Sequence, residues 1–264
     1  MNQTRVITFN ANGIRAATRK GFFNWFKNQN AQFLCIQETK AQRDQLDDPI
    51  YQPEGFHSYY FDALKKGYSG VAIYAKEKPN QIITGLDGIS WANDEGRYIE
   101  LEYDNLSIAS IYLPSGSAKD ERQLIKMQFL ALYEKLLEKQ IKHKKNMIIC
   151  GDINIVHKEI DIKNFKSNQK SSGCLPEERA WLDKVFDQIG WVDGFRVVNK
   201  EKDQYTWWSN RAQARANNVG WRIDYQWITP SLKDKVIQAS VYKDNWFSDH
   251  APLTIDYRID LPNN

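Results

Sequence analysis

Short apolar runs that end in polar or turn-forming residues recur along the chain. Residues 6–9, 33–36 and 147–150 are short β-rich runs of this kind, which is typical of buried strands. Residues 97–103 instead alternate between apolar and polar side chains, and residues 104–105 then predict a tight hairpin turn. The pattern therefore predicts many short strands.

Two segments carry helical spacing. Residues 119–142 form the longer one, with acidic residues in its first turn and lysines at its end, which suits the helix dipole. We expect its buried stripe to consist of Leu124, Met127, Leu130, Leu136, Leu137 and Ile141. A second helix is expected over residues 176–189, beginning with Pro176 and ended by Gly190.

Strands with few helices between them favour an α/β fold of two packed sheets with helices outside. The chain of 264 residues is 42% hydrophobic, which is enough to bury a sizeable core. No composition shift, flexible linker or repeat divides the sequence. We therefore expect residues 1–264 to form one domain.

The sequence start and the cysteines indicate the cellular setting. The first six residues lack the pattern of an export signal, and no apolar run approaches the ~20 residues of a membrane helix. Cys35, Cys150 and Cys174 are odd in number and favour buried free thiols over disulfides or a zinc site. We expect a cytoplasmic protein without a membrane partner. The formal net charge of +3 permits a nucleic-acid surface without requiring one.

Polar side chains follow several of the expected strands at the point where each strand ends. Asp152 and Asn154 come just after residues 147–150 and lie two apart, so they can face the same side. Ordinary turn chemistry is the alternative, because Gly, Asp and Asn are common in tight bends. Similar polar residues near strand ends are Asn10, Asn12, Glu38, Tyr112, Asp224, Asp249 and His250.

If loops from both sheets meet at one rim, several carboxylates crowd together there. Such crowding is unfavourable unless a cation or proton relieves it, and oxygen ligands suit Mg²⁺ or Mn²⁺. A metal and a protonated His250 can neutralise a phosphate ester while a carboxylate takes a proton from water. The alternatives are that Glu38 opens a helix or pairs with Lys40, and that His250 is structural. No nucleotide-binding P-loop or Gly-x-Ser-x-Gly turn is present, which favours direct attack by water.

Five motifs, in order along nearly the whole chain, resemble the exonuclease III family of apurinic/apyrimidinic (AP) endonucleases, within the DNase I-like superfamily. They are Asn-Ala-Asn-Gly-Ile-Arg at 10–15, Gln-Glu-Thr-Lys at 37–40, Gly-Asp-Ile-Asn at 151–154, Asn-Asn-Val-Gly-Trp-Arg-Ile-Asp-Tyr at 217–225 and Ser-Asp-His at 248–250. Each motif is weak alone, but the five together are specific. The resemblance implies a four-layer α/β sandwich. It also implies Mg²⁺-dependent cleavage of DNA 5′ to an abasic site, leaving a 3′-hydroxyl, with some trimming of 3′ ends.

The resemblance further implies a role for each matching residue. The residues implied for metal binding are Glu38, with Asn12 and Asp249 in or next to the metal shell. Of the residues implied for catalysis, Asp152 activates or orients the water, and Asn154 and Asn10 assist it. His250, paired with Asp224, and Tyr112 hold the phosphate. The residues alone leave open whether Asp152 or Asp249 is the base.

The DNA contacts come from the same resemblance. Trp207, Trp221 and Ile223 match an apolar pocket for the extruded abasic sugar, with core packing as the alternative for the tryptophans. Residues that match DNA-backbone contacts are Arg15, Tyr68, Arg97, Asn164 and Asn168. The implied partner is double-stranded DNA with abasic sites or 3′-blocked ends, bound by a monomer. Ser115 and Asn12 depart from the family, which often has Asn and Asp there.

Two other functions stay open on the sequence. A phosphatase of the same superfamily, acting on lipid headgroups or inositol phosphates, would share Glu38, Asp152 and His250. It would also share Asn154, but it has no evident use for the Trp207 and Trp221 pocket or for the loop with Arg211 and Arg215. A DNA-binding module that has lost catalysis is the second alternative, and the intact polar residues argue against it.

Overall fold

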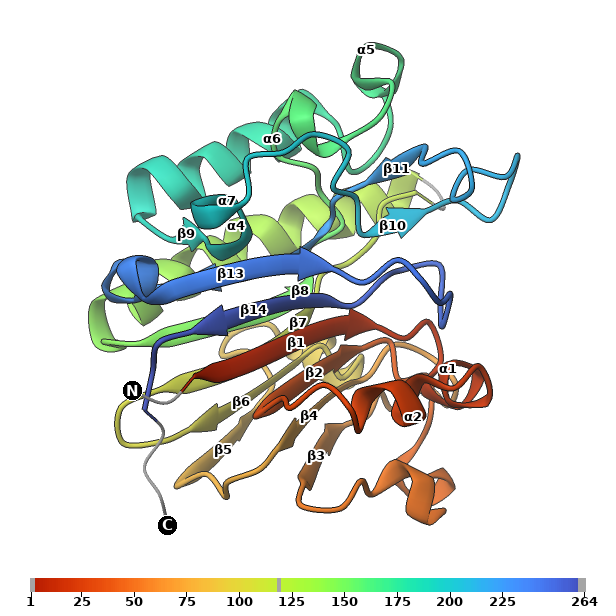
Figure 1. The fold of residues 1–264 in the computed structure, drawn as a ribbon. Coiled ribbons are helices and arrows are strands. Elements are labelled where there is room, and N and C mark those ends of the chain that lie inside the picture. The colour runs from red at the N-terminus through yellow and green to blue at the C-terminus, as the bar shows by residue number, and fades with distance from the viewer. Residues whose placement is uncertain (1–2, 118–119, 261–264) are drawn as a thin grey trace.

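A computed structural model describes residues 3–117 and 120–260 and contains two six-stranded sheets (Figure 1). In spatial order, the first sheet consists of β13 (Val236–Val241), β14 (Leu253–Tyr257), β1 (Thr4–Asn10), β2 (Phe33–Gln37), β4 (Val71–Ala75) and β3 (His57–Phe61). The second consists of β5 (Gln81–Thr84), β6 (Tyr98–Glu102), β7 (Ser107–Tyr112), β8 (Met147–Asp152), β12 (Asp224–Ile228) and β9 (Val192–Asp193). Within the described residues, β1 with β2 and β7 with β8 pair in parallel, and the other pairs of these sheets are antiparallel.

Apolar layers join the sheets to each other and to the helices. Cys35 of the first sheet and Cys150 of the second belong to the core between the sheets. The helices on the outer faces are α1 (Ile14–Arg19) and α2 (Phe22–Phe26) on the first sheet, and α4 (Asp120–His143) and α6 (Pro176–Asp183) on the second (Figure 1). The expected four-layer α/β sandwich, with two mostly antiparallel sheets, is confirmed.

Shorter elements complete the fold. The remaining helices are α3 (Ser90–Asp94), α5 (Phe165–Asn168) and α7 (Gly194–Val198), with 3₁₀ turns at Arg43–Gln45, Pro49–Tyr51, Glu159–Asp161 and Pro230–Lys235. A small antiparallel sheet joins β10 (Trp207–Trp208) to β11 (Gly220–Trp221). The expected hairpin turn between β6 and β7 is confirmed, and the N–H of Tyr103 donates to the carbonyl of Leu106 at 2.8 Å.

Helix α4 confirms the longer expected helix, but its buried stripe differs from the expected one. The expected first residue, Lys119, lies outside the described residues. Leu130 and Leu137 are buried as expected, whereas Leu124 is 64% exposed. The buried residues are Lys126, Phe129, Leu130, Tyr133 and Leu137, spaced three or four apart on one face. The prediction for Leu124 was wrong because apolar character alone was counted and Leu124 lies off this face.

The second expected helix ends as predicted but changes type near its end. Gly190 has φ 100°, in the left-handed region that glycine adopts readily. Residues Lys184–Ile189 form a π-helix, and the N–H groups of Gly190 and Trp191 both donate to the carbonyl of Val185 at 3.1 Å.

The expectation of buried free thiols is confirmed. Cys35, Cys150 and Cys174 are buried and free. In the described parts of the chain, no helix combines the length and apolar character that crossing a membrane requires.

Candidate active site

Strand ends from both sheets meet at one edge of the sandwich. β1 ends at Asn10 and its parallel neighbour β2 ends just before Glu38, so both residues lie at the same edge. In the second sheet, parallel β7 and β8 end together at Tyr112 and Asp152. β12 is antiparallel to β8, so it begins with Asp224 directly opposite Asp152. Strand pairing thus gathers polar residues that are far apart in the sequence.

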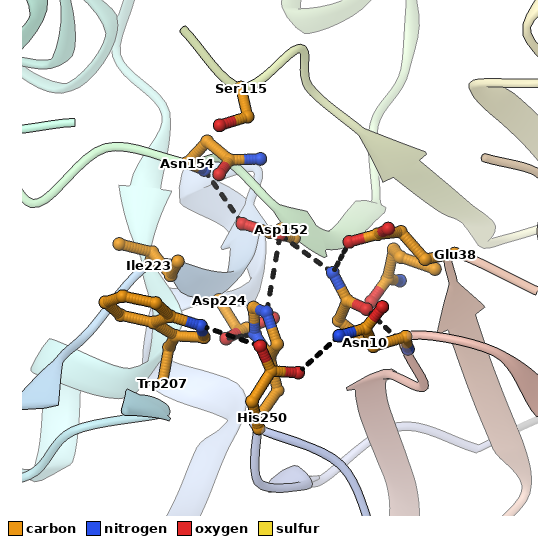
Figure 2. A network of polar contacts seen from close by, with 12 residues as sticks. Asn10, Glu38, Ser115, Asp152, Asn154, Trp207, Ile223, Asp224 and His250 are labelled. Atoms are coloured by element: carbon orange, nitrogen blue, oxygen red, sulfur yellow. Dashed lines mark hydrogen bonds and ion pairs between the residues drawn. The ribbon is translucent and has the colours of Figure 1, made fainter. Parts of the chain in front are cut away.

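Asn10 joins the two sheets at this edge. It is fully buried, and its side-chain amide donates to Glu38 Oε1 and to Asp152 Oδ2, both at 2.8 Å (Figure 2). Its Oδ1 accepts from the N–H of Asn12 at 2.9 Å, and the hydroxyl of Ser248 donates to its carbonyl at 2.8 Å. One amide therefore holds two carboxylates of different sheets and offsets their repulsion.

Asp152 is a buried carboxylate at the centre of the cluster. Its Oδ1 accepts from the N–H of Asn154 at 2.9 Å, and its Oδ2 lies 3.8 Å from Nε2 of His250. Burial, with smaller contributions from Asp224 and Glu38, raises the pKa of Asp152 to about 8 against the opposing effect of His250. The bond to Asn154 is also the turn geometry considered as an alternative, so the turn and the cluster coexist.

Left-handed backbone conformations gather around this cluster at residues other than glycine. They are Asn12 (φ 43°), Glu38 (φ 51°), Lys40 (φ 48°) and Asn154 (φ 56°). Such conformations cost on the order of 1–3 kcal/mol each and persist only where surrounding contacts impose them. These four are among eleven described residues other than glycine with positive φ, and strained backbone of this kind is often found at functional sites.

His250 is paired with Asp224 below the cluster. Its Nδ1 lies 2.8 Å from Asp224 Oδ2, and both side chains are buried. Burial lowers the pKa of His250, but the charge and hydrogen bond of Asp224 outweigh it and raise that pKa to about 10. The imidazole is therefore cationic at neutral pH, with Nε2 on the side of Asp152.

Asp249 and Lys40 complete the polar group. Asp249 Oδ1 accepts from the side-chain amide of Asn12 at 2.9 Å, and its Oδ2 accepts from the indole N–H of Trp207 at 3.1 Å. Lys40 donates to the side-chain oxygen of Asn12 and lies 2.8 Å from Glu38 Oε2. The pairing of Glu38 with Lys40, considered as an alternative, is thus present within the cluster.

Glu38, Asp152 and His250 can hold a metal ion. Their ligand atoms all lie within 4.8 Å of one another. A protonated imidazole has no free lone pair, so the two carboxylates are the donors of this group. Carboxylate oxygens suit a hard divalent cation such as Mg²⁺ or Mn²⁺. Asn12 and Asp249, expected in or next to the metal shell, bond to each other beside it.

A cavity of about 860 Å³ opens over the cluster and has walls of two kinds. Its polar lining includes Glu38, Tyr112, Asp152, Asn154, Asp249 and His250, and its apolar lining includes Leu175, Trp207, Trp221 and Ile223. The rings of Trp207 and Trp221 meet edge to face with centroids 5.9 Å apart. Both rings are only partly buried, so they also present surface to the cavity (Figure 2 shows Trp207 and Ile223).

The five residues expected at the DNA backbone do not line this cavity. Arg15 is exposed on α1, Asn164 is exposed just before α5, and Asn168 is half-buried at the end of α5. Tyr68 is half-buried, and its hydroxyl accepts from Arg122 at 2.9 Å.

Arg97 differs from the other four expected DNA contacts. Only 1% of it is exposed, and it donates to the carbonyl of Tyr112 at 2.8 Å and to the hydroxyl of Tyr68 at 3.3 Å. Its guanidinium also lies 4.7 Å from the Tyr112 ring centroid. The side chain of Arg97 is thus used inside the protein, and its contact with the DNA backbone stays a prediction.

Comparison with known proteins agrees with this geometry. The profile described as Endonuclease/Exonuclease/phosphatase family matches residues 7–250. This chain belongs to that family. An exodeoxyribonuclease of Bacillus subtilis (strain 168) is 41% identical over 254 residues, covering 95% of this chain and 98% of that protein. A DNA-(apurinic or apyrimidinic site) endonuclease of Dictyostelium discoideum is 35% identical over 262 residues, covering 96% and 70%. The solved structure of an AP endonuclease from Archaeoglobus fulgidus has a TM-score of 0.87 at 26% identity, covering 97% of this chain and 100% of that one.

Several residues that line the cavity could not be identified from the sequence of this endonuclease/exonuclease/phosphatase family protein. Ser171, Ser172 and Leu175 line it, as do Asp120 and Gln123 at the start of α4. Ser171, Ser172 and Leu175 come from the segment just before α6, and none of these cavity residues belongs to one of the five motifs.

Proposed function

We propose that this protein is a divalent-metal-dependent DNA repair endonuclease that hydrolyses the phosphodiester 5′ to abasic sites and leaves a 3′-hydroxyl. The observation that supports this proposal is a single cavity with two unlike walls. One wall carries Asp152 beside the cationic His250, and the other carries Trp207 and Trp221. The first suits hydrolysis of a phosphodiester, and the second suits a sugar that has lost its base.

The relatives support the same chemistry. One is named an exodeoxyribonuclease and another an endonuclease for apurinic or apyrimidinic sites. The similarity spans 95% and 96% of this chain. We therefore include 3′-5′ exonuclease and 3′-phosphodiesterase activities in the proposal, with base excision repair as the process and a monomeric single domain as the working form.

Glu38 is proposed as the main metal ligand, with Asn12 and Asp249 in or beside the metal shell and Mg²⁺ or Mn²⁺ as the ion. A bound divalent cation neutralises negative charge on the phosphate as the reaction proceeds. Asn10 and Lys40 each contact one oxygen of Glu38, at 2.8 Å, and so fix the direction of the carboxylate.

Asp152 is proposed to take a proton from the attacking water or to orient it. Its raised pKa makes the deprotonated carboxylate a stronger base than an ordinary aspartate. That form would predominate above about pH 8, or at lower pH when a bound divalent cation stabilises its negative charge. The side-chain amide of Asn10 and the N–H of Asn154 each hold one of its oxygens. The Asn154 side chain, which donates to the carbonyl of Leu113 at 3.0 Å, lies at the cavity wall to assist the water.

His250 and Tyr112 are proposed to hold the scissile phosphate. Asp224 keeps the imidazole protonated, so His250 offers a positive charge and an Nε2–H donor. Burial raises the pKa of Tyr112 well above its ordinary value, so its hydroxyl keeps its proton and can donate. Both groups would stabilise charge that develops on the phosphate oxygens.

Trp207, Trp221 and Ile223 are proposed to receive the abasic sugar. A wall of this size and apolar character would exclude a sugar that still carries its base, and a damaged site is also easier to extrude from the duplex. Around the cavity, Arg15, Tyr68, Asn164 and Asn168 are proposed to contact the DNA backbone.

A substrate panel tests the proposal. Synthetic duplexes that are abasic, blunt-ended or blocked at the 3′ end are incubated with the protein in Mg²⁺ and in EDTA, beside an inositol phosphate. We expect Mg²⁺-dependent cleavage of the abasic duplex to be fastest. Faster release of phosphate from the inositol phosphate would favour the phosphatase alternative, and binding to DNA without turnover would favour the binding-module alternative.

A further inference from the structure

A buried ion pair contacts residues of the cavity lining. Lys126 of α4 and Glu178 of α6 are both 0% exposed, and Nζ lies 2.6 Å from Oε1. Removing two charges from water is costly, and an apolar pair of similar volume is often as stable or more stable. Joining two helices is therefore a weak reason for charges at this place, and the other contacts of the pair are more informative.

The ammonium group of Lys126 reaches out of its helix to the polar wall. It donates to the backbone carbonyl of Asn154 at 2.9 Å. The N–H of the same residue holds Asp152 at 2.9 Å, and its side chain holds the carbonyl of Leu113. Lys126 thus fixes the backbone of Asn154, whose side-chain amide is proposed to assist the water.

The carboxylate of Glu178 reaches the opposite part of the lining. Its Oε2 accepts from the N–H groups of Gly173 at 2.6 Å and Leu175 at 3.1 Å. Its Oε1 accepts from Gln123 at 2.9 Å, and Gln123 in turn accepts from the hydroxyl of Ser172 at 2.6 Å. Ser172 and Leu175 both line the cavity. Glu178 thus fixes the segment from residue 172 to residue 175.

Gly173 brings these two parts into contact. Its φ is +91°, and a Cβ atom there would lie 2.9 Å from the carbonyl oxygen of Asn154 and 3.0 Å from the ring of Trp221. Its own carbonyl accepts from the N–H of Val156 at 2.8 Å. The segment held by Glu178 is therefore packed between the peptide held by Lys126 and the tryptophan of the proposed sugar pocket.

We propose that Lys126 and Glu178 are positioning residues that set the placement of Asn154 relative to Trp221. This inference rests on the proposed function, because the two residues act on the reaction through that placement. An apolar pair could pack the two helices together, but it could not hold a carbonyl oxygen on one side and two N–H groups on the other. A shift of about 1 Å between reacting groups can cost on the order of 100-fold in rate.

The test compares two double variants of the full-length protein. Lys126→Met with Glu178→Leu removes the buried pair, leaving apolar groups in its place. The matched control is Lys184→Met with Glu134→Leu. This pair joins α4 to the π-helix that follows α6, also at 2.6 Å, but it is half-buried rather than fully buried and does not line the cavity. Both are assayed for kcat and KM on an abasic duplex in Mg²⁺, at a temperature where thermal unfolding shows each variant folded.

We expect the buried-pair variant to lose about 10- to 100-fold in kcat with little change in KM, and the control to stay within about twofold. Asn154→Ala is then added to the wild type and to the buried-pair variant. The combined loss in kcat should be smaller than the product of the separate losses, because both changes act through Asn154. A merely structural pair would give multiplicative losses.

Three outcomes separate the possibilities. A folded buried-pair variant with kcat near the wild-type value would overturn the positioning role and leave the proposed function standing. Failure of the wild type to cleave the abasic duplex would overturn the proposed function itself. If the double variant does not fold, Glu178→Gln is assayed instead, since it removes the charge but keeps an oxygen, and an unchanged kcat there would also overturn the positioning role.

Discussion

Asp152 and Asp224 occupy facing positions on β8 and β12, and His250 lies against both carboxylates. Nδ1 of the imidazole is 2.8 Å from Asp224, and Nε2 is 3.8 Å from Asp152. Two buried carboxylates side by side repel each other, and a cation between them relieves this repulsion. Asp224 therefore raises the pKa of His250 and favours its charged form. In the proposed function, this cation would stand beside the Asp152 that acts on water.

Replacing Asp224 by Asn should remove most of the cleavage activity while sparing DNA binding. The pKa of His250 is raised chiefly by Asp224, so the variant loses the cation that faces the phosphate. We expect kcat to fall by about 10²- to 10⁴-fold. A matched control is Asp183→Asn, because Asp183 pairs with His157 at 2.7 Å at the protein surface. Equal turnover by both variants in a gel cleavage assay would contradict the role of Asp224.

Replacing Glu38 by Ala should raise the metal concentration that cleavage requires. Glu38 is oriented by Asn10 and Lys40, and one of its oxygens lies within 4.8 Å of ligand atoms of Asp152 and His250. We expect the Mg²⁺ concentration for half-maximal rate to rise by at least about tenfold. The measurement is a Mg²⁺ titration beside Glu134→Ala, a carboxylate outside the cavity. An unchanged titration curve for Glu38→Ala would count against Glu38 as a ligand.

Replacing Trp221 by Ala should weaken the preference for abasic sites. Trp221 and Trp207 form the apolar wall, so a wider pocket would accept a sugar that carries its base. We expect the ratio of kcat/KM for abasic over intact duplex to fall by about 10- to 100-fold. Trp246→Ala is the control, because Trp246 is 54% exposed and does not line the cavity. If both variants keep the wild-type ratio, Trp221 serves core packing only.

Stability at low pH should depend on Asp161, which lies outside the active site. Burial raises its pKa, but Arg222 and Arg196 outweigh burial and lower it to about 2, from an ordinary value of 3.8. A lowered folded-state pKa gives stability that is complete above pH ~4 and is lost as the pH falls toward ~2, and the loss amounts to about 2 kcal/mol. Urea unfolding of the wild type between pH 5 and pH 2 measures it.

Asp161→Asn gives the matching test of that ion network. It removes the charge that Arg222 and Arg196 share, while Arg222 keeps its ion pair with Asp193 at 2.6 Å. The unfolding free energy at pH 7 should therefore fall by about 1–3 kcal/mol. Asp203→Asn is the control, because Asp203 meets Lys163 in an exposed pair and should matter little. A wild-type-like unfolding curve for Asp161→Asn would show that the network does not stabilise the fold.

The strands and the polar residues at their ends could be predicted from local pattern. Asn10, Glu38 and Asp152 each follow a short β-rich run, and that position depends only on the alternation and on turn residues nearby. Their convergence could not be predicted in the same way. It depends on which strands pair and in which direction, and a parallel pair such as β7 with β8 leaves no local mark. The motifs of a known family supplied that information.

Buried charges were the least predictable part of the site. Lys126 and Arg97 are 0% and 1% exposed, although a lysine or arginine in a surface helix or strand is usually solvated. Each is buried because it pairs with groups that are distant in the sequence or on a neighbouring strand, as Lys126 forms an ion pair with Glu178. Such partners are set by tertiary packing, which hydrophobic periodicity does not contain.

In the proposed function, residues of both sheets form one hydrolytic centre for abasic DNA, with Asp152 acting on the water. The most direct measurement is cleavage of a duplex with a single abasic site by the wild type and by Asp152→Asn, with product ends identified and binding measured in EDTA. We predict a wild-type break immediately 5′ to the site with a 3′-hydroxyl, and a loss of about 10²- to 10⁴-fold for the variant at nearly unchanged affinity. Wild-type-like cleavage by Asp152→Asn, or no cleavage by the wild type, would contradict the account.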